Sequence, residues 1–283
     1  MATFTNQATL RYNGNVVNSN ITTGELVEVL SATKTAVIDS YEPGSDVTYV
    51  IQIVNSGNIA FTGLSITDNL GAFSFGTETL VPLDYVNGST QYYANGVLQT
   101  VPTVTAGPPL VISGINVPAN GVATIIYVAK ANQFAPLGTE DSITNSAVID
   151  GGGITPITVT ETIAPESGAR LSITKSICPA TVTENGTLTY TFTIINTGNT
   201  PAVATDDVTV TDTFNPILTN LVVALDGTTW SAPANYTYDE TTGEFATVPG
   251  QIVVPAATYT QDAITGEWII DPGVVVLTVT GTV

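Results

Sequence analysis

Histidine is absent from this chain, cysteine occurs once, and lysine and arginine together number five among 283 residues. The absence of histidine rules out a His-based catalytic triad and any His-ligated metal centre. The single cysteine, Cys178, excludes an intrachain disulfide framework and a multi-cysteine zinc or iron–sulfur site. No stretch approaches the roughly 18 consecutive apolar residues of a membrane-spanning helix. The opening segment, MATFTNQATLRYNG, has neither the basic nor the apolar region of a secretory signal.

Acidic side chains dominate the charge, with 24 aspartates and glutamates and a formal net charge of −19. Such a charge repels phosphate backbones and anionic lipid headgroups, which argues against partners of either kind. The hydrophobic fraction of 43% is too high for a disordered acidic tail and is sufficient for a substantial core. We therefore expect a folded protein with no cofactor, no metal site, no nucleic-acid partner and no membrane insertion.

The remaining pattern is that of an all-β protein. Threonine, valine and isoleucine alternate with period two in several runs, which include residues 47–54, 188–195, 208–212 and 274–280. Turn-forming pairs such as Asn87-Gly88, Asn95-Gly96 and Asn185-Gly186 separate such runs. No segment shows sustained helical periodicity. Many short strands with this punctuation predict sandwiches of the immunoglobulin type.

The chain contains an internal repeat. Leu30-Ser-Ala-Thr-Lys34 matches Leu171-Ser-Ile-Thr-Lys175, 141 positions later, and residues 46–58 match 187–199 at the same spacing. Ile66-Thr-Asp68 matches Val210-Thr-Asp212 with a small shift. These residues resemble the domain-of-unknown-function-eleven repeat of bacterial surface and spore-coat proteins. The resemblance covers most of the chain in two copies, and it implies immunoglobulin-like sandwiches with a structural role.

The second repeat lacks strands that the first one has. The first copy continues through residues 143–149 and 157–161, whereas the second stops after the strand at 273–279. The missing hairpin is found at the other end of the chain, where residues 4–10 match 143–149. We therefore predict the following order: a donor hairpin (1–25), a joint (26–29), a complete sandwich (30–163), a joint (164–169) and an incomplete sandwich (170–283).

An incomplete sandwich and a hairpin without a core can each complete the other by strand addition. The joint at 26–29 is too short for an easy fit within one chain, so we expect the hairpin to close the second domain of a neighbouring copy. The expected donor strand presents Phe4, Asn6, Ala8 and Leu10. A head-to-tail contact of this kind does not close on itself and propagates as a filament. The simpler alternative is a truncated second domain with a disordered N-terminus.

Strand alternation also directs one lysine, one aspartate and one asparagine toward the interior of each sandwich. The first trio is Lys34, Asp68 and Asn145; the second is Lys175, Asp212 and Asn6, the last supplied by a neighbour. The trios are similar to those of Gram-positive pilin domains, where lysine and asparagine form an isopeptide bond assisted by a buried acid. Asp68 and Asp212 would be the assisting acids. A hydrogen-bonded ion pair beside a satisfied asparagine is the alternative, and a one-residue register slip would invert every face.

The expected function is that of a structural subunit of a self-assembling, extracellular or spore-surface filament, with itself as partner and an unidentified surface anchor. Enzyme activity on an external substrate is not expected, because no nucleophile–base pair is available beyond the trios. The alternative is a surface adhesin or ligand-binding module. It would use aromatic side chains in an extra hairpin at 84–110, including Tyr85, Tyr92 and Tyr93, or the pair Trp230 and Trp268.

Overall fold

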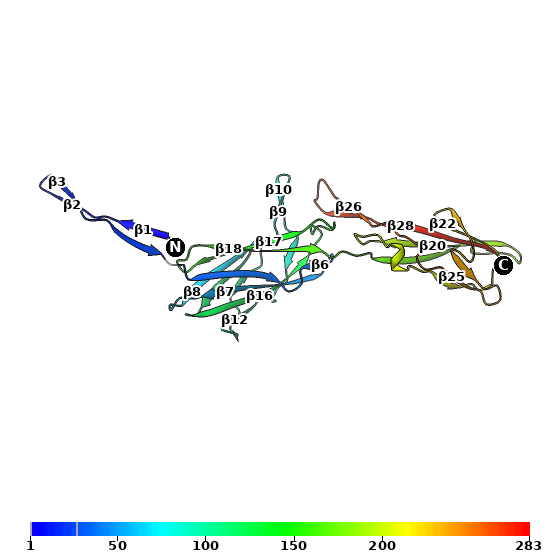
Figure 1. The fold of residues 1–283 in the computed structure, drawn as a ribbon, viewed down its shortest axis with the longest axis horizontal. Coiled ribbons are helices and arrows are strands. Elements are labelled where there is room, and N and C mark those ends of the chain that lie inside the picture. The colour runs from blue at the N-terminus through cyan, green and yellow to red at the C-terminus, as the bar shows by residue number, and fades with distance from the viewer. Residues whose placement is uncertain (1, 27) are drawn as a thin grey trace. The chain divides into compact units, whose positions relative to one another are not determined.

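A computed structural model describes residues 2–26 and 28–283, so Met1 and Val27, the latter in the predicted joint, lie outside it. The described chain is built from β-strands and one short 3-10 helix, η1 (Ala204–Asp206), which confirms the predicted all-β fold (Figure 1). The chain forms two compact units. Unit 1 comprises Met1–Asp39, Gly44–Asn132 and Thr144–Ile163, and unit 2 comprises Ser40–Pro43, Gln133–Ile143 and Ala164–Val283.

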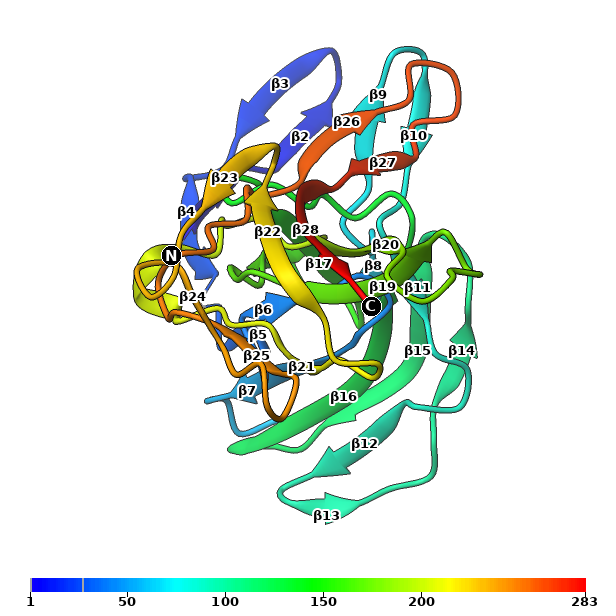
Figure 2. The same cartoon turned by 90° about the vertical axis from the view of Figure 1, so that its right-hand side faces the viewer.

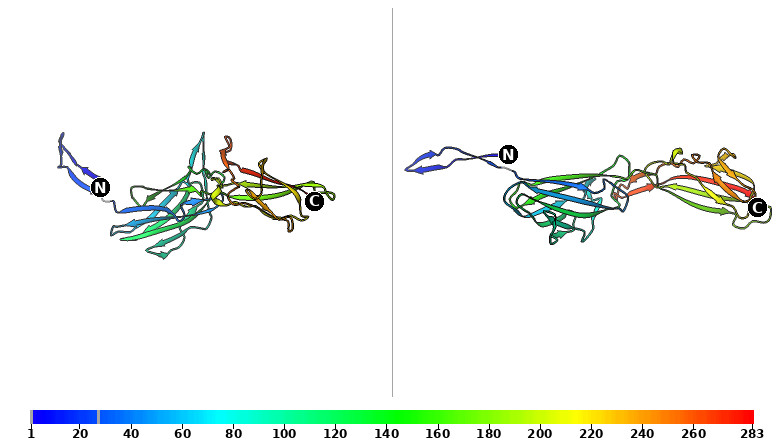
Figure 3. Two further views of the ribbon diagram at one scale, coloured as in Figure 1. Left: turned by 45° about the vertical axis from the view of Figure 1, so that its right-hand side comes forward. Right: turned by 60° about the horizontal axis from the view of Figure 1, so that its bottom comes forward.

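The first segment is a long hairpin whose arms run side by side (Figure 3). Its strands are β1 (Ala2–Asn6), β2 (Thr9–Tyr12), β3 (Asn15–Asn18) and β4 (Thr22–Leu26), with β1 paired to β4 and β2 to β3. Asn13 and Gly14 at the tip both have positive φ, as a two-residue hairpin turn requires. Between the two ladders, residues 7–8 face 19–21, and this bulge places Leu10 opposite Val17.

Unit 1 contains two large sheets. The first runs in the order β13 (Val97–Leu98), β12 (Gln91–Ala94), β16 (Gly121–Ala131), β7 (Asp46–Asn55) and β5 (Leu30–Ala36), with β11 (Leu83–Tyr85) also on β16. The second runs β14 (Thr103–Thr105), β15 (Leu110–Val117), β8 (Phe61–Asp68), β17 (Ile143–Gly151) and β18 (Ile157–Pro165). The last two residues of β18 belong to unit 2, where they pair with β6 (Ser40–Tyr41). A separate small hairpin joins β9 (Phe73–Phe75) to β10 (Glu78–Leu80).

The core of unit 1 follows from strand alternation. Every second residue of β7, including Tyr49, Ile51 and Ile53, is fully buried, and the intervening residues are not. Ile66 of β8 and Ala147 of β17 are buried from the opposite sheet. The two inner faces therefore form one apolar interior, as in a sandwich.

Unit 2 repeats the first sheet but has a reduced second one. The first runs β19 (Leu171–Cys178), β20 (Thr187–Asn196), β28 (Gly273–Thr282), β22 (Thr219–Leu225) and β23 (Thr228–Trp230). Strands β22, β23 and β28 of this first sheet are labelled in Figure 2. The second has three strands, β21 (Thr211–Thr213), β25 (Glu244–Thr247) and β24 (Tyr236–Tyr238), and a further hairpin joins β26 (Thr258–Gln261) to β27 (Trp268–Asp271). The core contains Phe192, Phe214 and Phe245.

The strand predicted over 208–212 is paired only from Thr211 to Thr213. In unit 1 the corresponding strand, β8, lies between β15 and β17, whereas β21 pairs with β25 alone among the described strands. The segment thus has the residue alternation of a strand, but no described strand pairs with its other side.

Candidate functional site

Lys34 points into unit 1 from β5, where the alternation of this strand buries it. Its Nζ lies 2.7 Å from Asp68 Oδ2, and both side chains are fully shielded from solvent. The ammonium also lies 4.9 Å from the centre of the Tyr49 ring. A buried charge is tolerated only when paired, so this contact is what permits a lysine at the position.

Asp68 is the hub of the cluster. Its Oδ2 also accepts the Tyr127 hydroxyl at 2.5 Å, and its Oδ1 accepts the backbone N–H of Leu70 at 2.9 Å. Tyr127 comes from β16, where it lies opposite Tyr49 of β7, and the two rings stack. Hydrogen bonds from two strands and a turn therefore fix the orientation of the carboxylate.

Asn145 enters from β17, which pairs with β8 so that Ala147 lies opposite Asp68. The Asn145 amide Nδ2 donates to the Tyr127 hydroxyl at 3.2 Å. Its Oδ1 is buried and has no hydrogen-bond partner among the described residues. A buried carbonyl without a partner is costly, so the asparagine is not fully satisfied in this arrangement.

The electrostatics of the cluster follow from its burial. Burial lowers the pKa of Lys34 to about 8, against the opposing attraction of Asp68. Burial likewise raises the pKa of Tyr127 well above its ordinary value, so this hydroxyl stays protonated and keeps donating. The lysine is thus closer to the neutral amine than an exposed lysine would be.

The structure brings Lys34, Asp68 and Asn145 together, as predicted from their faces, and adds Tyr127, which the sequence analysis missed. The missing signal was available, since alternation along 121–127 directs Tyr127 inward on the same face as Ala123 and Ile125. What could not be read from the sequence was its register against Tyr49.

The second trio is only half assembled. Lys175 of β19 is bonded to the Asp212 carboxylate and lies 4.3 Å from the centre of the Tyr190 ring. The side chains of Lys175 and Asp212 remain 40% and 18% exposed. Val279 lies opposite Tyr190 in β28, so an aliphatic side chain takes the place that Tyr127 has in unit 1. Asn6 lies on β1 and is exposed.

The open side of unit 2 is apolar. All of β19 is exposed, including Leu171, Ile173 and Ile177, whereas β5 of unit 1 buries Lys34. The hairpin is also exposed from Thr3 to Glu25 except for half-buried Gly24. Its apolar side chains therefore lie in solvent; they are Phe4, Ala8, Leu10, Tyr12, Val16, Val17 and Ile21. Exposed apolar surface on an unpaired edge marks an interaction site.

The aromatic side chains expected to bind a ligand are built into the fold. The prediction of an exposed aromatic hairpin at 84–110 is wrong for Tyr92, which is 6% exposed and donates its hydroxyl to Asn116 O. It is buried because β12 extends the first sheet of unit 1 beside β16. Trp230 packs against the core of unit 2. Tyr92 and Trp230 are therefore not free to stack on a ligand, whereas Tyr85, Tyr93 and Trp268 are half-buried.

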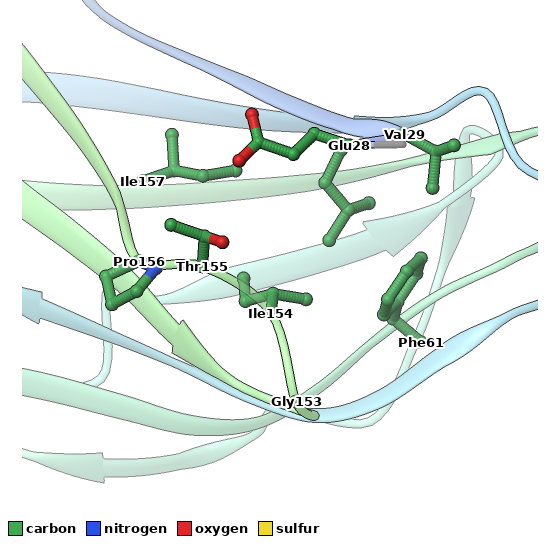
Figure 4. Close-up of a pocket in the computed structure, with 9 residues that line it drawn as sticks. Glu28, Val29, Phe61, Gly153, Ile154, Thr155, Pro156 and Ile157 are labelled. Carbon is green, nitrogen blue, oxygen red and sulfur yellow. The ribbon is translucent and has the colours of Figure 1, made fainter. Parts of the chain in front are cut away.

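One end of unit 1 carries a small pocket of about 180 Å³, lined by Glu28, Phe61, Ile154 and their neighbours (Figure 4). Glu28 is the one charged residue in this lining. Sites for small ligands are usually about 300–1,000 Å³, so this pocket is too small to favour ligand binding. Among the described residues, no helix has the length and apolar character needed to cross a membrane.

Comparison with protein-family models and with curated proteins finds no match. Among solved structures, the pilus backbone RrgB of Streptococcus pneumoniae shares 13% identity, with a TM-score of 0.35, over 86% of this chain and 55% of that one. The major pilin BcpA of Bacillus cereus shares 10% identity, with a TM-score of 0.36, over 95% of this chain and 73% of that one. A collagen-binding domain of a Staphylococcus aureus adhesin shares 11% identity, with a TM-score of 0.30, over 50% and 99%.

This chain spans 55% of the length of the RrgB chain. Membership of the domain-of-unknown-function-eleven family stays a prediction.

Proposed function

We propose that this protein is the structural subunit of a self-assembling filament, in which the N-terminal hairpin of one copy completes unit 2 of the next. The observation that carries the proposal is the presence of two exposed apolar surfaces in one chain. The unpaired side of β21 and the exposed face of β19 form the acceptor, and the hairpin forms the donor. Each surface is unfavourable alone, and their union removes both from water.

The repeat supplies the geometry of the proposed joint. Phe4, Asn6, Ala8 and Leu10 match four inward residues of β17, and all four of these are buried; they are Ile143, Asn145, Ala147 and Ile149. The donor strand would therefore fill the space beside β21 that β17 fills beside β8. The ring of Phe4 lies over Gly24 on the opposite arm, so close that a side chain at Gly24 would collide with it. The hairpin thus presents a preformed apolar face.

The same proposal assigns a crosslink to each sandwich. The Lys34 ammonium first gives a proton to Asp68, and the neutral amine attacks Cγ of Asn145. Asp68 donates that proton to the amide nitrogen and takes one from the attacking nitrogen, the Cγ–Nδ2 bond breaks, ammonia leaves, and a new amide bond joins the two side chains. Lys175 and Asn6 of a neighbour would react in the same way, assisted by Asp212. The short Lys34–Asp68 contact, the lowered pKa of Lys34 and the unsatisfied Asn145 Oδ1 support the first reaction. No external substrate is involved, so the chain is not an enzyme in the usual sense.

Such a filament would lie outside the cell, on a cell or spore surface. The adhesin alternative is less well supported, because Tyr92 is buried and Trp230 packs against the core of unit 2. The two functions differ in the state of the purified protein. Long uniform fibres under the electron microscope are expected for the filament subunit, and monodisperse particles for the adhesin.

Deleting residues 2–22 tests the donor hairpin, and fibres that persist after this deletion would contradict the proposal. Intact-mass spectrometry tests the crosslinks. Wild-type monomer is expected to have lost one ammonia, and Asn145→Ala should restore the full mass. The Asn6→Ala monomer should still have lost one ammonia relative to its own sequence mass. Its multimers should separate on boiling in detergent. An unmodified mass for wild-type monomer, with no detergent-resistant multimers, would show that neither crosslink forms.

A further inference from the structure

The register of unit 1 locates a charged residue of the hairpin in the proposed joint. In unit 1, β17 pairs with β8 so that Asp150 lies opposite Ser65. Arg11 follows Leu10 as Asp150 follows Ile149 in the matching strand. Thr209 precedes Val210 as Ser65 precedes Ile66. The same register would therefore place Arg11 of a docked hairpin opposite Thr209 of the acceptor.

The acceptor shares one backbone feature with its counterpart, although the residues before it form η1 in unit 2 and the start of β8 in unit 1. Gly63 has a φ of 71° and Asp207, at the corresponding place, has a φ of 50°. Val210 is buried, as Ile66 is in unit 1, and Thr209 and Asp207 are exposed. From Asp207 to Val210 the more buried residues therefore alternate as they do from Gly63 to Ile66 of β8, which accepts β17.

Asp207 is the acid within reach of Arg11 in this register. It lies two residues from Thr209 on the solvent side, and such diagonal neighbours across a strand pair lie about 7–8 Å apart, within range of a long side chain. The neighbouring Asp206 is already engaged, because its Oδ2 accepts the backbone N–H of Val203 at 2.8 Å. In the described part of the chain, no hydrogen bond or ion pair reaches the carboxylate of Asp207.

Arg11 is the only cation between residues 2 and 26, in a chain with a net charge of −19. It is exposed on β2, close to the hairpin tip. Copies that carry so much negative charge repel one another, so a cation at the leading end of the donor opposes that repulsion where contact begins.

We infer that Arg11 of one copy forms an ion pair with Asp207 of the next and selects the hairpin for its acceptor. The inference rests on the proposed donor-strand function and names the charge recognition within that joint. Unit 1 lacks this ion pair, since it has Asp150 where the hairpin has Arg11 and Gly63 where the acceptor has Asp207. A strand with aspartate at the Arg11 position would meet Asp207 with a like charge, which disfavours the wrong donor.

Assembly of the full-length protein, followed by light scattering at low ionic strength, tests the ion pair. Arg11→Glu and Asp207→Lys should each slow assembly by about tenfold or more, and the double swap should recover most of the rate. Sodium chloride at about 0.5 M should largely remove the difference between wild type and the Arg11→Glu variant. Lys130→Glu, which makes the same change in net charge at an exposed site outside the joint, should assemble nearly as fast as wild type.

Equal slowing by Lys130→Glu and Arg11→Glu would show a net-charge effect and overturn the ion pair. Normal assembly of Arg11→Glu, together with loss of assembly on deletion of residues 2–22, would also overturn the ion pair while leaving the donor hairpin intact. Assembly that survives the deletion would instead contradict the proposed function. Circular dichroism melting of each variant shows whether a slow rate reflects loss of folding, and failure of the double swap to recover in folded protein counts against the inference.

Discussion

Lys34 and Lys175 occupy the same strand position in two repeats, but their surroundings differ. Lys34 and Asp68 are wholly enclosed, whereas Lys175 keeps 40% of its side chain exposed beside Asp212. The cause is the neighbouring sheet, because β17 and β18 extend the sheet of β8 in unit 1, and β21 pairs only with β25 among the described strands. The lysine–aspartate contact therefore forms without a covering hairpin. The contact is shielded from solvent only where the neighbouring strands cover it.

This difference bears on when each crosslink could form. Burial is the main cause of the lowered pKa of Lys34, and Lys175 lacks that burial. In the proposed filament, a docking hairpin would supply both the burial and Asn6. Reactivity at the second site would then arise only in a completed joint, so subunits would not be locked before they pair.

The largest contrast is expected from removing the two acids. In Asn145→Ala, which keeps Lys34 as a free amine, adding Asp68→Ala should lower the free energy of unfolding of unit 1 by about 3–5 kcal/mol, because it leaves a buried ammonium without its partner. Asp212→Ala should lower that of unit 2 in the monomer by less than about 1 kcal/mol, because Lys175 is partly solvated. Urea denaturation of unassembled protein measures both values. Similar losses at the two positions would show that the sites do not differ in the way that their exposure indicates.

The pH dependence of stability sharpens the same contrast. In Asn145→Ala, Lys34 remains a free amine whose pKa falls from its ordinary 10.5 to about 8 on folding. Between these values the unfolded chain binds the additional proton, so the free energy of unfolding should rise with pH. The expected gain from pH 8 to about pH 9.5 is about 2 kcal/mol. Adding Lys34→Met to this variant should remove the rise of the free energy of unfolding with pH, as measured by urea denaturation. A rise that persists would show that other groups cause the pH dependence.

Strand alternation was enough to predict most of the first site. Lys34, Asp68 and Asn145 each sit in a run with a clear apolar face, and a period of two fixes the side of the strand whatever its neighbours are. The repeat then transferred the same faces to Lys175 and Asp212. These are local properties, which is why they could be read without knowing how the sheets pair.

The parts that escaped prediction depend on pairing across the sheet. Tyr127 reaches Asp68 because β16 aligns it with Tyr49, and Val279 cannot do so from the matching place in β28. The burial of Tyr92 likewise depends on β12 joining the edge of β16. Neither register can be derived from one strand alone, since the contacts join residues far apart in the sequence.

Tyr127 provides a smaller test of why the two sites differ. Tyr127→Phe removes the hydroxyl that bridges Asp68 and Asn145, and should lower the free energy of unfolding of unit 1 by about 2 kcal/mol. It should also delay the loss of ammonia seen by mass spectrometry in freshly made protein. Tyr92→Phe is the matched control, since this buried hydroxyl of unit 1 donates to Asn116 O and not to Asp68. Equal delays in the two variants would make the hydroxyl of Tyr127 irrelevant to the reaction.

The smallest effect on the monomer is expected on the open strand itself. Ile173 of β19 is 53% exposed, so Ile173→Ala should change the free energy of unfolding of unassembled protein by no more than about 0.5 kcal/mol. In the filament the same side chain would be covered by the donor hairpin, so the variant fibres should dissociate at a lower temperature. Ile269→Ala on β27, which is 51% exposed outside the proposed joint, should leave fibre melting unchanged. Both isoleucines are about half exposed in the single chain. Only a docked hairpin would therefore make their effects on fibre melting differ. Identical fibre melting of the two variants would place the contact elsewhere on the subunit.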